Sequence, residues 1–138
     1  MNWEDLIKEL SNVNGLQNVF NQYSVDYTHN SIRRKNLFIY LRQMSQIKPE
    51  VMLVGEAPGY HGCRFTGVPF TSEYILINGI GKDSIFGKDK GYMKTRESAI
   101  TKREQTATIV WETMINHDFL PLMWNAFPFH PYKQGNPM

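Results

Sequence analysis

Apolar residues spaced three and four positions apart predict the helices of the first part of the chain. The first such set is Trp3, Leu6, Ile7 and Leu10. These residues would share one face of a helix over residues 3–10, and a second short helical piece is expected through Val19 and Phe20. The next helix can be capped by Asn30 or Ser31 and should end before Pro49. Its buried stripe is again apolar: Leu37, Tyr40, Leu41 and Met44.

Two apolar runs predict strands, and the second contains one polar residue, Asn125. The first run covers residues 51–54, and the second covers residues 121–127. Neither run alternates with polar residues, which is typical of parallel strands that are covered on both faces. We therefore expect two buried strands that lie parallel to each other.

The segment between the two runs carries turn residues and further helices. Residues 73–80 fit a short helix, whereas residues 81–100 are polar and contain glycines, so we expect a surface loop there. Thr101 followed by Glu104 matches a capping box and predicts the start of another helix. That helix would turn four residues toward the core: Ala107, Val110, Trp111 and Met114. Residues 128–138 are expected to form a loop.

This order of elements predicts a single α/β domain over residues 1–138 with a parallel sheet. A sheet of only two parallel strands would be a poor core. We therefore expect one of two situations. Either the chain is the N-terminal portion of a longer domain, incomplete at its C-terminus, or another chain completes the sheet, as a dimer would.

Composition narrows the class of protein. Apolar residues make up 41% of the chain, which is enough for a soluble core, and no apolar run approaches the ~20 residues of a membrane span. The N-terminus lacks the basic start and the apolar stretch of a signal peptide. Cys63 is the only cysteine, so no internal disulfide can form. We expect a cytoplasmic protein with no membrane partner, no metal and no cofactor.

The formal net charge of +2 says little about partners, but the charge is unevenly distributed. Residues 82–103 contain seven basic residues against three acidic ones, a net charge of +4. Such a segment could contact the phosphates of a nucleic acid. It could equally be a solvated loop.

The stretch from Gly55 to Glu73 holds the most specific pattern in the chain, GEAPGYHGCRFTGVPFTSE. It directly follows the first predicted strand, and ligands of α/β sheets bind beyond the carboxyl ends of the parallel strands. The second strand delivers Asn125 to the same edge. An asparagine amide offers an acceptor and a donor side by side, which match the N3–H and O4 edge of uracil. Phe70 could stack on the base, and backbone amides of the glycine loop could hold the base oxygen O2 or a phosphate.

Together these segments resemble two motifs of the uracil-DNA glycosylase superfamily. The first motif reads Gly55-x-Ala57-Pro58-Gly59-x-His61-Gly62 and then Thr66-Gly67-x-Pro69-Phe70-Thr71-x-Glu73. It is most similar to the broad-specificity thermophile-type branch, which has an aspartate at the position of Glu73, and in part to the single-strand-selective branch. The second motif, Trp124-Asn125-Ala126-Phe127-Pro128, is similar to the strand that reads uracil in this family. The match covers residues 50–131.

The resemblance implies both a fold and an activity. The fold would be a three-layer α/β/α sandwich around a central parallel sheet of four strands. The activity would be that of a DNA-repair hydrolase, which flips uracil, and related deaminated bases, out of DNA and hydrolyses the N-glycosidic bond for base-excision repair. The partner would be DNA that contains uracil, and no metal or cofactor would be required.

The resemblance also implies roles for individual residues. Phe70 matches the stacking ring, and Asn125 matches the residue that reads the base. Ala57 stands where several branches place an aspartate or asparagine that positions water, so the candidate catalytic carboxylates are Glu73 and Glu56. The other substrate-binding candidates lie in the glycine loop: Gly55, Ala57, Pro58, Gly59 and His61.

Three departures from the family pattern qualify these expectations. Gly59 replaces a tyrosine that blocks the thymine methyl group in the most uracil-strict branch, which implies a roomier pocket. The family's His-Pro-Ser motif is absent, and His130-Pro131 follows Asn125 by only five residues, so we do not assign it that role. The four cysteines that hold an iron–sulfur cluster in related branches are also absent.

Simpler alternatives exist for each assignment. Glu73 could favour a helix N-terminus, Asn125 could bond only to backbone, and Phe70 could be plain core. His61 and Cys63 lack the rest of a zinc-deaminase signature, and His61 could order the loop. The whole chain could be a glycosylase-like nucleic-acid-binding module without catalysis, or a binder of small nucleobases or nucleotides.

Overall fold

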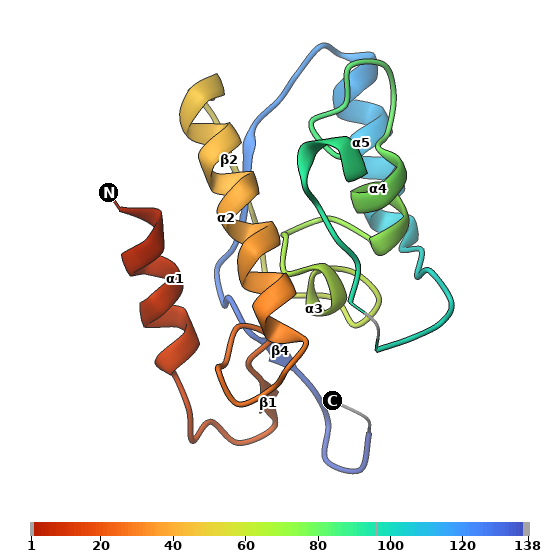
Figure 1. The fold of residues 1–138 in the computed structure, drawn as a ribbon. Helices are drawn as coiled ribbons and strands as arrows, with labels where there is room; N and C mark the ends of the chain where they lie inside the picture. Colours follow the sequence, from red (N-terminus) through yellow and green to blue (C-terminus); the bar gives the residue numbers. More distant parts are fainter. Residues whose placement is uncertain (1, 96, 137–138) are drawn as a thin grey trace.

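The computed structural model describes residues 2–95 and 97–136 (Figure 1), so Arg96 of the basic segment lies outside the described residues. Its elements are, in chain order, α1 (Trp3–Asn12), β1 (Val19–Phe20), α2 (Asn30–Ile47), β2 (Met52–Gly55), α3 (Cys63–Thr66), α4 (Glu73–Asn78), the 3-10 helix η1 (Lys88–Lys90), α5 (Gln105–Asn116), β3 (Leu122–Asn125) and β4 (His130–Pro131). β2 pairs with β3 in parallel, and β1 pairs with β4 antiparallel. Helices combined with small sheets confirm the mixed α/β class.

The helix ends follow the expected chemistry with two exceptions. The first is the start of α2, where the N-cap is His29, without a side-chain hydrogen bond, rather than Asn30 or Ser31, because Asn30 is already the first residue of the helix. The Asn2 side chain accepts a hydrogen bond from the amide of Glu4 and caps α1. α2 ends at Lys48, whose left-handed φ of 55° turns the chain before Pro49. The predicted capping box at Thr101 is wrong, because Glu104 is itself the N-cap of α5 and its carboxylate accepts from two amides of the first turn.

Three short elements differ from the sequence-based expectations. Residues 19–20 form strand β1 rather than a helical piece, because Val19 and Phe20 pair with β4. β4 in turn lies inside the segment that was expected to be a loop. α3 forms a turn of helix inside the glycine-rich stretch, and it ends at Gly67 with a φ of 77°.

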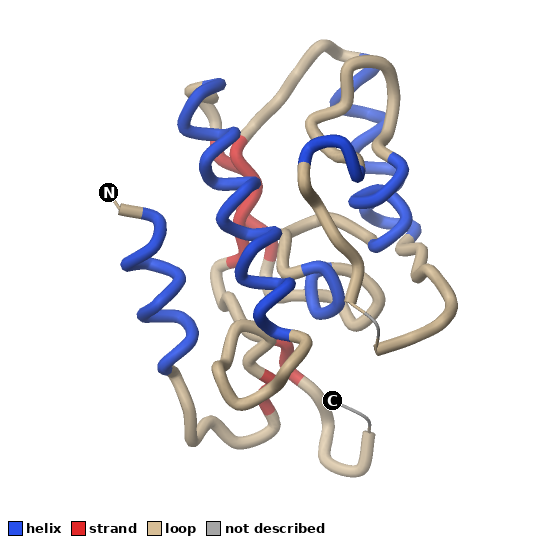
Figure 2. Tube along the Cα trace, in the orientation of Figure 1, coloured by secondary structure: helices blue, strands red, loops and turns tan. Residues whose placement is uncertain are grey.

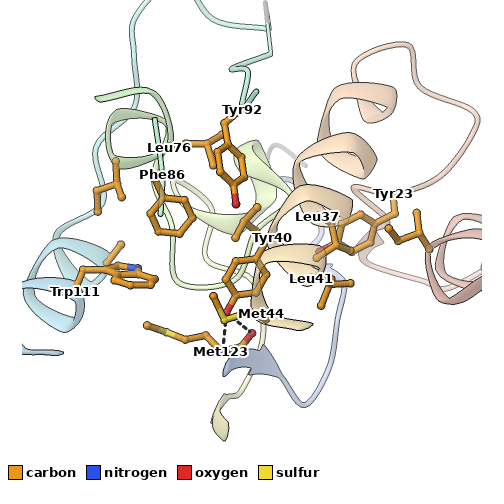
Figure 3. Packing of buried hydrophobic residues seen from close by; sticks show 14 of the residues in the cluster. Tyr23, Leu37, Tyr40, Leu41, Met44, Leu76, Phe86, Tyr92, Trp111 and Met123 are labelled. Atoms are coloured by element: carbon orange, nitrogen blue, oxygen red, sulfur yellow. Dashed lines mark hydrogen bonds between the residues drawn. The ribbon is translucent and has the colours of Figure 1, made fainter. Parts of the chain in front are cut away.

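The core lies between the β2–β3 sheet and the helices packed over it (Figure 3). α2 crosses in front of both strands of this sheet in the view of Figure 2. The Tyr40 hydroxyl accepts a hydrogen bond from the Met123 amide at 2.8 Å and so ties α2 to β3. Phe86 and Trp111 pack edge to face, with ring centroids 4.9 Å apart. Both Tyr40 and Met123 are fully buried, which makes this side of the sheet the packed one.

Strand β2 is not covered as expected. Within the described residues it pairs with β3 along one edge and has no strand on its other edge. Met52 keeps 52% and Val54 keeps 57% of its surface exposed, and because side chains project from the faces of a sheet, the face of β2 that carries these two residues is uncovered. The prediction of a strand buried on both faces is therefore wrong for β2.

In the described part of the chain, no helix combines the length and the apolar character that crossing a membrane requires.

Candidate functional site

A cavity of about 210 Å³ opens at the carboxyl ends of β2 and β3. It is lined by Gly55, Glu56, Ala57, Gly59, Gly62, Cys63, Phe70, Thr71, Glu104, Thr106 and Asn125. Six of the nine predicted site residues are in this lining, although the loop and the asparagine are far apart in the sequence. The volume is below the roughly 300 Å³ at which pockets for drug-sized ligands begin, so the cavity suits one small ring.

Gly55 lets an aromatic ring and an amide meet over the end of β2. A Cβ atom at this position would lie 2.7 Å from Cζ of Phe70 and 2.9 Å from Oδ1 of Asn125. Real Cβ atoms do not approach other atoms so closely, so the close approach requires glycine. The parallel register places Gly55 directly opposite Asn125, which explains why residues 70 positions apart in the chain face one space.

Asn125 is buried as a residue, with only 4% of its surface exposed. Its side-chain amide makes no hydrogen bond to the described residues, yet it is not one of the fully buried polar groups that lack a partner. The amide is therefore open to the cavity that Asn125 lines, where an entering group could bond to it. The alternative in which Asn125 bonds only to backbone finds no support in these contacts.

Phe70 is held in an uncommon backbone conformation. Its φ of 53° lies in the left-handed region, which bulky residues rarely adopt. The indole Nε1 of Trp111 donates to the Phe70 carbonyl at 3.0 Å and fixes that peptide. Sequence reasoning assigned Trp111 to the core alone. The only available signal was that a buried indole N–H needs an acceptor.

Two carboxylates line the cavity, and one of them was not predicted. Glu56 is an exposed residue of the loop after β2. Glu104 also lines the cavity and is the N-cap of α5, where its carboxylate accepts from the amides of Thr106 and Ala107. Two negative charges disfavour a phosphate in this cavity and favour a neutral ring or a developing positive charge. The sequence marked Glu104 only as a helix-start residue.

Glu73 is not part of the cavity lining. Its side chain is fully buried, and Oε2 accepts a hydrogen bond from the Lys102 amide at 2.8 Å. The Tyr74 amide donates to the Lys102 carbonyl at 3.0 Å, so the start of α4 is tied to the loop before α5. Burial raises the pKa of the Glu73 carboxyl, and the bond from Lys102 opposes this rise. A catalytic role for Glu73 stays a prediction.

Pro58 and His61 also lie outside the lining, for different reasons. Pro58 is buried, and its carbonyl accepts a hydrogen bond from Nδ1 of His130 at 2.9 Å. His61 is exposed, and its ring meets that of Tyr60 edge to face at 4.8 Å. Cys63 does line the cavity, but burial raises the pKa of its thiol to about 12, so it is neither a thiolate nucleophile nor a ready metal ligand.

No group of three or more His, Cys, Asp or Glu side chains that could hold a metal occurs among the described residues.

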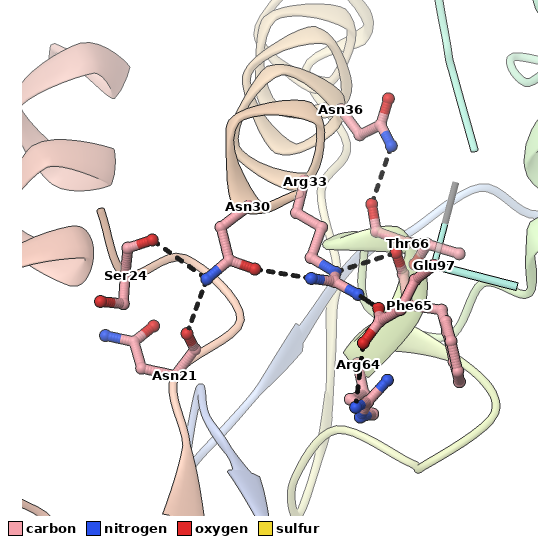
Figure 4. A network of polar contacts seen from close by, with 9 residues as sticks. All are labelled: Asn21, Ser24, Asn30, Arg33, Asn36, Arg64, Phe65, Thr66 and Glu97. Atoms are coloured by element: carbon pink, nitrogen blue, oxygen red, sulfur yellow. Dashed lines mark hydrogen bonds and ion pairs between the residues drawn. The ribbon is translucent and has the colours of Figure 1, made fainter. Parts of the chain in front are cut away.

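A buried polar network connects α2 to the glycine-rich stretch of residues 55–73 (Figure 4). Arg33 of α2 donates to the Phe65 carbonyl at 3.1 Å and to Oδ1 of Asn30 at 2.6 Å, and it forms an ion pair with Glu97. Arg64 of α3 shares the same Glu97 carboxylate. A Cβ at Gly67 would lie 2.5 Å from the Arg33 carbonyl oxygen, so α3 is pressed against α2. These contacts tie α3, which carries the cavity residue Cys63, to α2.

Two cations of the basic segment stand next to the Glu104 side of the cavity. The Arg103 guanidinium lies 3.6 Å from the ring centroid of Tyr74, and the Lys102 ammonium lies 5.9 Å from that of Phe65. Both rings belong to the α3–α4 segment that carries Phe70. These cations could contact phosphates that the cavity itself would repel.

We predict that His130 makes the stability of the fold depend on pH. Burial lowers the pKa of His130, and the nearby Arg64 guanidinium acts in the same direction. The unfolded chain therefore binds the proton more readily, with a pKa of about 6.5. The stabilisation is complete above that pH and is lost as the pH falls toward the lower pKa of the folded state.

Urea unfolding at pH 8 and pH 5 tests this prediction on the wild type and on His130→Asn. The asparagine amide nitrogen takes the place of Nδ1 and can still donate to the Pro58 carbonyl, but it cannot titrate. We expect the free energy of unfolding to fall more on acidification in the wild type than in the variant. Equal losses in both proteins would remove His130 as the cause.

No protein family, curated protein or solved structure matches this chain.

Proposed function

We propose that the chain is a DNA glycosylase that removes uracil and related deaminated bases from DNA. The observation that carries this proposal is the Asn125 amide, which opens into the cavity, makes no hydrogen bond to the described residues and meets the Phe70 ring over Gly55. An amide reads a pyrimidine edge by one acceptor and one donor, and a ring stacks on the base face. The resemblance of the two motifs to the glycosylase superfamily points to the same chemistry.

The cavity supports a single extruded base as the ligand. Its 210 Å³ volume suits one ring, and base-modifying enzymes act on nucleotides that are taken out of the stack. A Cβ at Gly59 would contact nothing within 4 Å. The pocket is thus open at the position where the strictest branch carries a blocking tyrosine, which supports tolerance of bases other than uracil.

Glu56 is the best-placed candidate for the hydrolytic step. It lines the cavity, whereas Glu73 does not. In hydrolysis a water oxygen bonds to C1′ of the sugar as the bond from C1′ to N1 of uracil breaks. The base leaves as an anion with the bonding electrons, and the proton that the water loses passes to solvent. A carboxylate beside the sugar stabilises the positive charge that develops there. With this function we also propose that the fold is a three-layer α/β/α sandwich and that the enzyme acts in the cytoplasm.

A second candidate function is a glycosylase-like module that binds nucleic acid without catalysis. The observation in its favour is Ala57, which lines the cavity with a methyl group where related enzymes place a side chain that positions water. Glu104 cannot easily replace that group, because its carboxylate already accepts from two amides of α5.

An oligonucleotide assay separates the two functions. The purified chain is incubated with a single-stranded oligonucleotide that carries one uracil, and abasic sites are cleaved by alkali. Matched oligonucleotides carry cytosine or thymine at that position. We expect cleavage of the uracil strand only, or preferentially. Uracil-dependent binding in a gel without cleavage would support the binding module. If the chain does not cleave the uracil strand and also does not bind it in a uracil-dependent way, both proposals are contradicted.

A further inference from the structure

Three cations of the basic segment gather around the loop that leads into α5. The Lys94 ammonium donates a hydrogen bond to Oγ1 of Thr101 at 3.2 Å, so residue 94 lies next to the end of its own segment. Lys102 and Arg103 directly precede Glu104, the N-cap of α5. We call Lys94, Lys102 and Arg103 the basic patch. Positive charge that is concentrated in this way attracts an anion.

Within the described residues, the side chains of the basic patch form no ion pair. Two acidic residues of the same segment are engaged elsewhere, because Asp89 pairs with Lys90 and Glu97 pairs with Arg33 and Arg64. An anion can therefore approach the patch without displacing an internal partner.

Stacking on an aromatic ring holds the Arg103 guanidinium in place. Its central carbon lies 3.6 Å from the ring centroid of Tyr74, and Tyr74 is itself fixed because its amide donates to the Lys102 carbonyl at 3.0 Å. The stacked guanidinium makes no hydrogen bond to a described residue. A guanidinium whose N–H groups are available can bind a phosphate through two parallel hydrogen bonds.

Two carboxylates lie beside the basic patch, and both are held by backbone amides. Glu73 is fully buried and accepts from the Lys102 amide at 2.8 Å, and Glu104 accepts from two amides of α5. Glu104 also lines the cavity, and a Cβ at Gly62 would lie 3.5 Å from its Cγ. Because Arg103 is the preceding residue of the chain, the basic patch adjoins the cavity on this side.

We propose that the basic patch binds a backbone phosphate of the nucleic acid strand whose base enters the cavity. A strand that places one base in the cavity must pass over its rim, where the patch lies. Arg103 would hold the phosphate through its two hydrogen bonds, and Lys94 and Lys102 would add attraction that does not depend on sequence. This inference rests on the nucleic-acid binding of the proposed function, but not on hydrolysis of the base.

Fluorescence anisotropy with a labelled single-stranded oligonucleotide that contains no uracil tests the basic patch apart from excision. Binding is measured over a range of salt concentrations. We expect Arg103→Ala to weaken binding about tenfold. The slope of log affinity against log salt concentration should become smaller by about 0.7, the value for one phosphate contact to a single strand. Lys8→Ala is the matched control and should bind like the wild type. It removes the same charge at an exposed position of α1, on the opposite side of the molecule from α4 (Figure 1).

Tyr74→Leu tests whether the position of the guanidinium is important as well as its charge. The variant keeps Arg103 and an apolar side chain but removes the ring under the guanidinium. We expect binding to weaken about threefold with the salt dependence of the wild type, provided that circular dichroism shows a folded protein. Wild-type affinity in Tyr74→Leu would contradict the role of stacking.

Two results would overturn the basic patch as a phosphate site. One is wild-type affinity and salt dependence in Arg103→Ala, and the other is an equal loss in Arg103→Ala and Lys8→Ala, which would indicate an effect of net charge alone. Excision of uracil is measured separately on the same proteins. If the wild type excises no uracil but Arg103→Ala binds more weakly as expected, the patch stands and the glycosylase proposal fails. If the wild type excises uracil and Arg103→Ala does so with the same kcat/KM, the patch fails and the glycosylase proposal stands.

Discussion

Replacing Asn125 by alanine is expected to lower uracil excision by on the order of 10²-fold or more. The side chain is buried at the carboxyl end of β3 and makes no hydrogen bond to the described residues. In the complex it would supply the acceptor for N3–H and the donor for O4. Without it those base atoms would be desolvated in the cavity and left unpaired, which costs about 1–3 kcal/mol for each group.

Two further variants make this result specific. Asn125→Asp keeps the shape and one acceptor but loses the donor to O4 and adds a negative charge, so we expect it to be nearly as inactive. Asn116→Ala removes an exposed asparagine at the end of α5, and we expect wild-type activity. The measurement is the single-turnover rate of abasic-site formation, with thermal unfolding as the check on folding.

An unchanged rate in Asn125→Ala would exclude Asn125 as the residue that reads the base. Equal losses in Asn125→Ala and Asn116→Ala would instead indicate a general effect on the protein. The prediction also separates binding from chemistry. If the chain is a binding module, Asn125→Ala should abolish discrimination between uracil and cytosine in a binding assay, although no product forms with either protein.

The meeting of Gly55 with Asn125 could be predicted because it depends on the sheet alone. Both residues end apolar runs, and the carboxyl ends of parallel strands lie at one edge. The observed register sets the two residues directly opposite each other. Gly55 and Asn125 could each be recognised as the end of an apolar run, and the parallel pairing of the two strands places them side by side.

The directions of the carboxylate side chains could not be predicted from the sequence. Glu73 and Glu104 both stand at helix starts, and local sequence does not tell which of them points into the cavity. Glu73 turns to the Lys102 amide and is buried, whereas Glu104 caps α5 at the cavity wall. The direction of each side chain is set by how the loop of residues 101–104 packs, which is a tertiary property.

The support of Phe70 and the exposure of β2 could not be foreseen either. Trp111 reaches the Phe70 carbonyl across 41 positions of sequence, and no spacing rule encodes such a contact. The apolar run of β2 correctly indicated a strand that requires cover, but its composition does not say what provides the cover. Within the described residues the helices cover the side of Met123, and the other edge of β2 stays open.

Replacing Gly55 by alanine is expected to damage the cavity more than the same change at Gly59 or Gly62, the other two glycines of its lining. The new Cβ would lie 2.7 Å from the Phe70 ring and 2.9 Å from the Asn125 amide oxygen. The ring cannot easily move away, because the Phe70 peptide is held by Trp111 in a left-handed conformation. We expect a loss of about 1–3 kcal/mol in the free energy of unfolding from overpacking. Uracil excision should fall on the order of 10²-fold, because stacking ring and base reader are displaced from each other.

Gly59→Ala is the matched control, since Gly59 lines the same cavity but a Cβ there would contact nothing within 4 Å. Its free energy of unfolding should change by less than about 0.5 kcal/mol, and its excision rate should stay close to that of the wild type. Urea unfolding and the oligonucleotide assay on both variants test the predicted difference in stability and in excision rate. Equal tolerance of the two substitutions would mean that Phe70 and Asn125 are not locked over Gly55, and the cavity would then lack the rigid geometry that reading a base requires.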